Sequence, residues 1–180
     1  APTLRMPTAG IPPHTKDRSL GEIDPRTWQT VAAPPSELGE SLFWHPDEQM
    51  LYWIDIPGKQ IHRSNVFIGT VESWLMPSEP GSIAPARTNG LASGLVIALR
   101  DGIYRARQWG GELQQLMQAQ HDTTTTRFND GKADPVGRFW AGTMYEPRDQ
   151  STAELFSLDG RDGRVPLVER TAGGATIAHG

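Results

Sequence analysis

Short apolar runs separated by turn residues follow one another along most of the chain. From residue 42 onward the runs span about five to seven residues and are bounded by Gly, Pro and Asp, a pattern typical of an all-β protein with many short strands. We expect strands at residues 42–45, 50–56, 60–65, 72–76, 95–99, 102–107, 112–117, 139–144, 154–158 and 165–169. Residues 1–36 hold many prolines and no sustained periodicity, so they are predicted to form an extended lead-in arm.

The expected strands repeat at a regular interval. Apolar strands at residues 51–54, 95–98 and 138–141 align with one another, because Trp53 and Val96 are 43 positions apart and Val96 and Trp140 are 44 apart. A repeat of this length that holds about four short strands is what one blade of a β-propeller requires. An irregular β-sandwich is the alternative that the pattern leaves open.

Composition excludes several classes of protein and limits the ligands that a metal site could use. The 19 glycines and 15 prolines among 180 residues exclude a helical bundle, and the net charge of −4 indicates no nucleic acid or anionic membrane as a partner. Without cysteine, a metal site must use oxygen or imidazole ligands. No apolar run approaches the roughly 20 residues of a membrane span, and we expect a cytoplasmic protein.

The densest group of polar residues is the segment RFNDGKADPVGRFWAGTM at residues 127–144. In a strand, Arg127 and Asn129 would share one face and Asp130 would point to the other. A guanidinium beside a carboxamide suits a polyol or a lactone carbonyl. Alternatively, Asn129, Asp130 and Gly131 form a turn and the charges are solvated.

Three segments together resemble the motifs of a known family. GESLFW at 39–44, LYWIDI at 51–56 and the segment at 127–144 are similar to successive motifs of the SMP-30/gluconolactonase/luciferin-regenerating enzyme family. The resemblance implies a six-bladed β-propeller, of which residues 37–180 would form about three to four N-terminal blades, so that the chain is incomplete. It also implies a sugar lactone as the substrate and one divalent cation, calcium, zinc, manganese or magnesium, in the central channel.

The resemblance also assigns residues by position. Glu40 matches the first metal ligand of the family, and Arg127 and Asn129 match residues that contact the substrate. Glu146 lies one position before the place of a further substrate-contacting glutamate, and His179 stands where a metal-binding asparagine is expected. The catalytic base, an aspartate, would lie beyond residue 180.

These expectations favour a metal-dependent hydrolase that opens sugar lactones. The metal would polarise the lactone carbonyl and an activated water would attack it. A non-enzymatic propeller that binds calcium or senses a ligand is the alternative, favoured by His179 in place of asparagine. An interaction scaffold is a third possibility. The oligomeric state and the particular lactone stay open.

Overall fold

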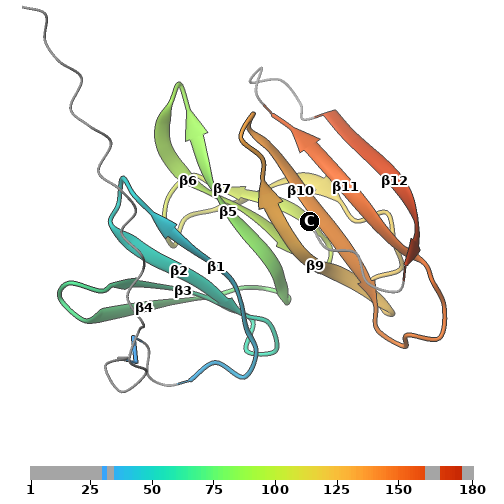
Figure 1. Ribbon diagram of the computed structural model, residues 1–180, viewed down its shortest axis with the longest axis horizontal. Helices are drawn as coiled ribbons and strands as arrows, with labels where there is room; N and C mark the ends of the chain where they lie inside the picture. The colour runs from blue at the N-terminus through green and yellow to red at the C-terminus, as the bar shows by residue number, and fades with distance from the viewer. Residues whose placement is uncertain (1–29, 32–34, 161–166, 176–180) are drawn as a thin grey trace, which may run out of the picture. The chain divides into compact units, whose positions relative to one another are not determined.

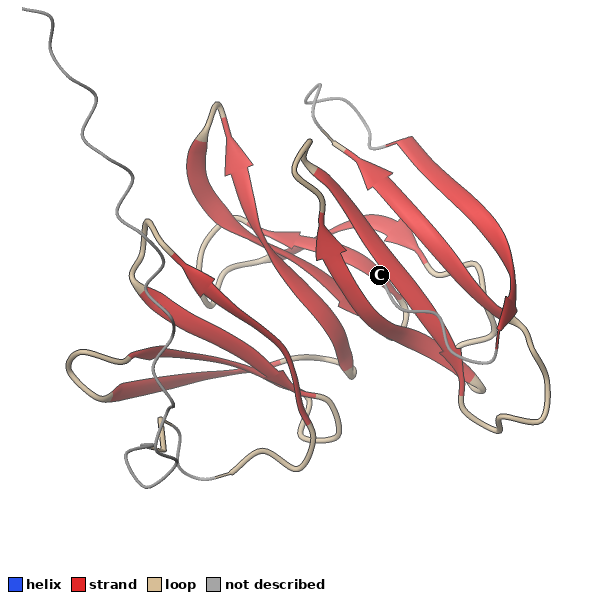
Figure 2. Ribbon diagram, viewed as in Figure 1, coloured by secondary structure: helices blue, strands red, loops and turns tan. Residues whose placement is uncertain are grey.

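The structure, a computed structural model, describes residues 30–31, 35–160 and 167–175, with the last of these ranges described as backbone only. The chain divides into two units, residues 1–30 and 31–180, and the fold below belongs to the second. All regular elements in the described ranges are strands (Figure 2). Accordingly, no helix there is long and apolar enough to span a membrane.

Within the described ranges, twelve strands form three antiparallel sheets of four, each built in chain order (Figure 1). The first sheet comprises β1 (Gly39–His45), β2 (Met50–Asp55), β3 (Gln60–Asn65) and β4 (Thr70–Leu75). The second comprises β5 (Pro80–Thr88), β6 (Leu91–Leu99), β7 (Gly102–Ala106) and β8 (Leu113–Gln118). The third comprises β9 (Thr126–Ala133), β10 (Arg138–Tyr145), β11 (Ala153–Asp159) and β12 (Leu167–Ala175). Each sheet is thus a four-stranded meander of the kind that forms a propeller blade.

The repeat expected from the sequence is confirmed strand by strand. The aligned segments 51–54, 95–98 and 138–141 lie in β2, β6 and β10, the second strand of each sheet. Two strands were not expected, namely β5 and β9, and both are the first strands of their sheets. The expected ends of the other strands differ from the observed ones by a few residues, most of all at β6, which begins earlier, and at β12, which ends later. Residues 165–166 of the strand expected at 165–169 lie outside the described residues.

The first strands of the three sheets lie against one another. Contacts join β1 to β5, β5 to β9 and β1 to β9. The Ser41 hydroxyl accepts a hydrogen bond from the Ile83 amide at 3.0 Å and donates one to the Ile83 carbonyl at 3.3 Å, which ties β1 to β5. At Gly81 of β5 a Cβ atom would clash with the carbonyl oxygen of Phe128 in β9. In a propeller, first strands that meet in this way line the central channel.

Two apolar clusters hold neighbouring sheets together. The cluster between the first and second sheets includes Tyr52, Ile54, Ile61, Ile97 and Leu99. The cluster between the second and third sheets includes Ala98, Ile103, Phe128, Phe139 and Phe156. Both clusters draw on β6, because Ile97 and Ala98 point to opposite faces of this strand. The second sheet is therefore packed on both sides.

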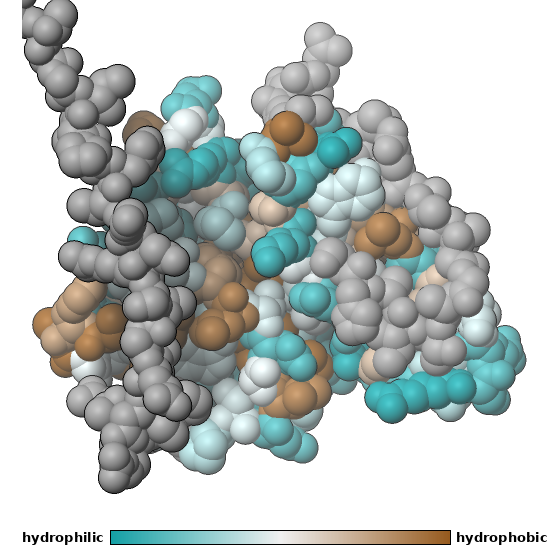
Figure 3. All heavy atoms as spheres, viewed as in Figure 1, coloured by the Kyte–Doolittle hydropathy of each residue, from teal (hydrophilic) through white to brown (hydrophobic). Residues whose placement is uncertain are grey.

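The two faces of the first sheet differ in how far their side chains are buried. Phe43 of β1 stacks on Tyr52, with the ring centroids 5.0 Å apart, on the face that packs against the second sheet. Its neighbours Leu42 and Trp44 lie on the opposite face, where they are 67% and 43% exposed. Phe67 and Ile68, in the turn between β3 and β4, are more than 70% exposed. Figure 3 shows apolar surface at the left, where this turn lies in Figure 1. These residues give the first sheet an apolar outer face.

Candidate functional site

Arg127 and Asn129 lie side by side on β9, the first strand of the third sheet. The Arg127 guanidinium donates from Nη1 to the Phe128 carbonyl at 2.9 Å and to Asn129 Oδ1 at 3.3 Å. Asp130 is exposed, and its carboxylate accepts a hydrogen bond from the Gly131 amide. The Asn-Asp-Gly segment is thus part of a strand rather than a turn: β9 pairs with β10 at residues 126–128 and 131–133, and a bulge lies at Asn129 and Asp130.

The geometry of this pair limits what it can bind. A guanidinium has only N–H donors, so the atom of Asn129 that faces it must be the amide oxygen, and the amide nitrogen points away. Nη2 of Arg127 lies 4.0 Å from the Met144 sulfur, a weak acceptor, and keeps a further N–H donor. The pair therefore offers donors and suits a ligand with acceptor oxygens, such as a carbonyl, a ring oxygen or a carboxylate.

Charged side chains surround the Arg127 guanidinium. Its side chain is only 8% exposed, and its Nε lies 3.5 Å from Oε1 of Glu146, which follows β10. Burial lowers the pKa of Arg127, Glu146 opposes this shift, and nearby Arg100 adds to it. Because the pKa of arginine lies so far above neutrality, the side chain stays charged.

Glu146 is shared with a second arginine. Arg100, in the turn between β6 and β7, donates from Nη1 to Oε2 and from Nη2 to Oε1 of Glu146, both at 3.0 Å. Its Nε donates to Glu79, just before β5, at 3.0 Å. We refer to Glu79, Arg100, Glu146 and Arg127 as the arginine network. Nothing in the sequence pointed to Arg100 or Glu79, because they lie 21 positions apart and Glu146 lies 46 beyond Arg100.

Glu40 occupies the start of β1, where the strand is irregular. A bulge interrupts the pairing with β2 between Glu40 and Phe43, and Ser41 has a φ of 54°. Glu40 pairs with Ile54 of β2 through its backbone, and its exposed carboxylate takes part in no hydrogen bond or ion pair among the described residues. Such a carboxylate is available as an oxygen ligand for a hard cation.

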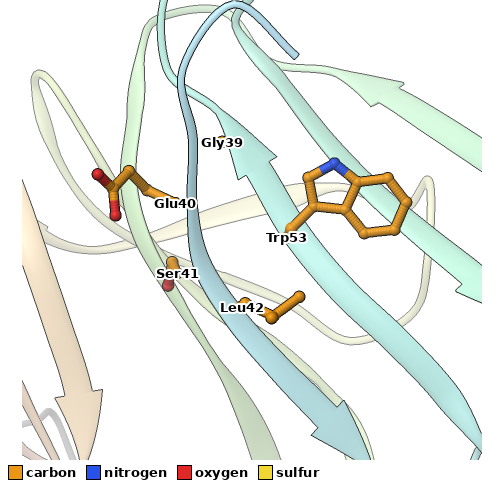
Figure 4. A pocket seen from close by; sticks show the side chains of 5 residues that line it. All are labelled: Gly39, Glu40, Ser41, Leu42 and Trp53. Atoms are coloured by element: carbon orange, nitrogen blue, oxygen red, sulfur yellow. The ribbon is translucent and has the colours of Figure 1, made fainter. Parts of the chain in front are cut away.

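A shallow hollow of about 300 Å³ lies beside Glu40. Its lining residues are Gly39, Glu40, Ser41, Leu42 and Trp53. Figure 4 shows the Glu40 carboxylate pointing away from the Trp53 indole, on the other side of β1. Trp53 donates to the Ser36 hydroxyl at 3.2 Å and stacks on His62 at 5.2 Å, so its indole serves packing in this part of the chain.

The described residues fit a metal ion only in part. Nowhere in residues 35–160 do three or more metal-ligating side chains gather. Glu40 alone supplies one carboxylate, whereas calcium takes six to eight oxygen ligands. His179, the other predicted ligand, lies outside the described residues. Glu40 and the Arg127–Asn129 pair come from β1 and β9, two first strands in contact.

Comparison with known proteins identifies the family. The family profile described as the SMP-30/gluconolactonase/LRE-like region matches residues 38–180, most of the chain. The chain belongs to this family. Among its relatives are a 6-deoxy-6-sulfogluconolactonase of Pseudomonas putida, 39% identical over 133 residues, and the pentonolactonase XacC of Haloferax volcanii, 38% identical over 142 residues. These matches cover 74% and 76% of this chain but only 44% and 43% of the relatives, so the chain spans less than half of their length.

Solved structures confirm the fold. A calcium-binding regucalcin of Agrobacterium tumefaciens superposes with a TM-score of 0.70 at 20% identity, covering 81% of this chain and 46% of that one. A luciferin-regenerating enzyme gives a TM-score of 0.66 at 23% identity, covering 77% and 46%. The family is thus one of lactone-hydrolysing and regucalcin-type proteins, and the three sheets are part of a propeller of that type.

Proposed function

We propose that the protein is a metal-dependent hydrolase of sugar lactones. The observation that carries this proposal is the buried Arg127 guanidinium, fixed against Asn129 so that the two side chains present N–H donors from the first strand of a blade. Named lactonases among the relatives support the same reaction class. We take the substrate to be an aldonolactone, whose carbonyl, ring oxygen and hydroxyl oxygens are all acceptors.

In this proposal the residues of the chain bind and orient the lactone. Arg127 and Asn129 donate hydrogen bonds to its oxygens and hold the ring in one orientation, which places the carbonyl for attack. Glu40 supplies one ligand to a divalent ion, and His179 a second. The bound ion would supply Lewis acidity at the carbonyl oxygen. The aspartate that removes a proton from the attacking water would come from the part of the protein beyond residue 180.

The test uses the full-length protein with calcium, zinc, manganese or magnesium added singly. Proton release is measured with gluconolactone, a pentonolactone and a sulfonated gluconolactone. We expect Arg127→Met and Asn129→Ala each to lower kcat/KM by about 100-fold, as loss of a placed donor does at other hydrolase sites.

Asp130→Asn is the matched control, because Asp130 neighbours Asn129 and bonds the Gly131 amide instead of the pair. We expect its kcat/KM to stay within about twofold of the parent, as for surface substitutions in general. A protein that binds calcium but accelerates hydrolysis of none of the lactones with any of the ions would be a ligand-binding propeller instead.

A further inference from the structure

Arg100 is the residue that joins the second sheet to the third beside the candidate site. Its guanidinium engages Glu79 of its own sheet and both carboxylate oxygens of Glu146. Nη1 also donates to the carbonyl oxygen of Thr123 at 3.0 Å. The planar Arg100 guanidinium therefore bonds three groups that are far apart in the sequence. Only the fork of N–H donors of an arginine can bond three groups in this geometry.

The groups that Arg100 holds on the third sheet lie at the end of the β9–β10 pair nearest Arg127. Thr123 precedes β9 and Glu146 follows β10, and Arg127 pairs with Met144 near this open end, away from the turn that joins the two strands. The Glu146 amide in turn donates to the carbonyl of Thr125 at 2.9 Å. Arg100 thus bonds both strands of this pair at the end nearest Arg127.

Glu146 links Arg100 to the Arg127 guanidinium, because its carboxylate contacts both arginines. Its Oε1 accepts from Arg100 at 3.0 Å and lies 3.5 Å from Arg127 Nε, while its Oε2 is engaged by Arg100. Arg100 and Glu79 are 19% and 23% exposed, so these charge-assisted bonds are partly shielded from water. Both oxygens of Glu146 already have arginine partners, which leaves the carboxylate poorly placed to contact a sugar.

We propose that Arg100 is a positioning residue for substrate binding and that it acts through Glu146 on the Arg127 guanidinium. Glu146 then belongs to this relay rather than to the residues that touch the lactone. The inference rests on the proposed function, because it assigns to Arg127 the contact with the substrate.

A double-mutant cycle on the full-length protein tests the relay, with kcat and KM measured for the lactone that is hydrolysed fastest. We expect Arg100→Met to lower kcat/KM by about tenfold when Arg127 is present and by less than about twofold in the Arg127→Met background, because residues in one network are not additive. Arg100→Lys keeps the charge and is expected to recover part of the loss, since a lysine cannot bridge Glu79 and Glu146 with the same fork.

The ¹⁵Nε–¹H NMR signal of Arg127 gives a readout that does not depend on turnover. We expect this signal to shift in Arg100→Met, Arg100→Lys and Glu146→Gln. The matched control is Arg63→Met, since Arg63 also pairs with two carboxylates, Glu72 and Glu48, but within the first sheet. We expect it to leave both kcat/KM and the Arg127 signal unchanged.

Equal losses from Arg100→Met in both backgrounds, or an unchanged Arg127 signal, would overturn the relay while leaving the lactonase proposal intact. If Arg127→Met alone left kcat/KM unchanged, the assignment of Arg127 to the substrate would be wrong, and the relay would be overturned with it.

Discussion

At the scale of single residues, Ser41 combines backbone strain with a hydrogen-bonding role beside Glu40. Its φ of 54° lies in the left-handed region, which costs a non-glycine residue about 1–2 kcal/mol. Its hydroxyl nevertheless makes two hydrogen bonds to Ile83 across the gap between β1 and β5. At Ser41, backbone strain therefore lowers the stability of the folded protein, and the two hydrogen bonds raise it.

Two substitutions separate these effects. Ser41→Ala removes both hydrogen bonds and keeps the strained Cβ atom, whereas Ser41→Gly removes the same bonds and relieves the strain. We expect the glycine variant to be more stable than the alanine variant by about 1 kcal/mol, measured from urea unfolding midpoints. An alanine variant as stable as the glycine variant would show that φ at Ser41 carries no strain.

Sequence motifs could identify single candidate residues but not their partners. Glu40, Arg127 and Asn129 were named from local segments, and the structure brings Arg127 and Asn129 into contact. Arg100 was not among the candidates, because its partners Glu79 and Glu146 are brought to it only by the packing of two sheets. Long-range ion pairs of this kind leave no periodic signal along the chain.

At the scale of strands, the two that were not predicted share a physical reason. β5 contains Pro80, Gly81 and Pro85, which resemble a loop, and β9 contains an Asn-Asp-Gly triplet, which resembles a turn. Both are first strands, where close approach of the sheets favours small residues over the bulky ones that mark an ordinary strand. The second strands were found readily, because the packed interior of each blade requires bulky apolar side chains there.

Asp55, at the end of β2, anchors the segment that leads into β1. Its carboxylate accepts hydrogen bonds from the amides of Glu37, Leu38 and Gly58 at 3.0, 3.1 and 3.4 Å. Burial raises the pKa of Asp55, but these amide bonds outweigh it, so the pKa lies below its ordinary value of 3.8. The charged form of Asp55 is therefore stabilised in the folded state.

This depressed pKa predicts a pH dependence. The contribution of Asp55 is present above the unfolded-state pKa near 3.8 and is lost as the pH falls through the lower folded-state value. We expect Asp55→Asn to lower the unfolding temperature at pH 7 and to reduce the drop in unfolding temperature between pH 5 and pH 2.5, followed by circular dichroism. A variant with the same acid sensitivity as the parent protein would contradict this role.

At the scale of the whole molecule, the close approach of the second and third sheets requires positions without a side chain. Gly81 of β5 lies where a Cβ atom would meet the backbone carbonyl of Phe128 in β9. Backbone atoms cannot rotate away, so any larger residue must push the two first strands apart.

We expect Gly81→Ala to destabilise the protein by about 2 kcal/mol, measured by urea unfolding. It should also weaken the Arg127–Asn129 site, because β9 carries both residues. Gly39→Ala is the control, since a Cβ atom at Gly39 makes ordinary contacts with Ser36 at 3.6 Å. Equal stability of the two variants would mean that β5 and β9 can separate at no cost.

The chain-order topology also has a consequence for synthesis on the ribosome. Every hydrogen-bonded strand pair within a sheet joins sequence neighbours, so the first sheet has all its strands by Leu75 and the second by Gln118. Translation takes roughly 2–8 s for a sheet of about 40 residues, whereas a hairpin forms in about 1–10 μs. The nascent chain therefore has time to complete one sheet before the next emerges. The arginine network forms only after Glu146, which follows β10, has left the exit tunnel, because Arg100 bonds its carboxylate.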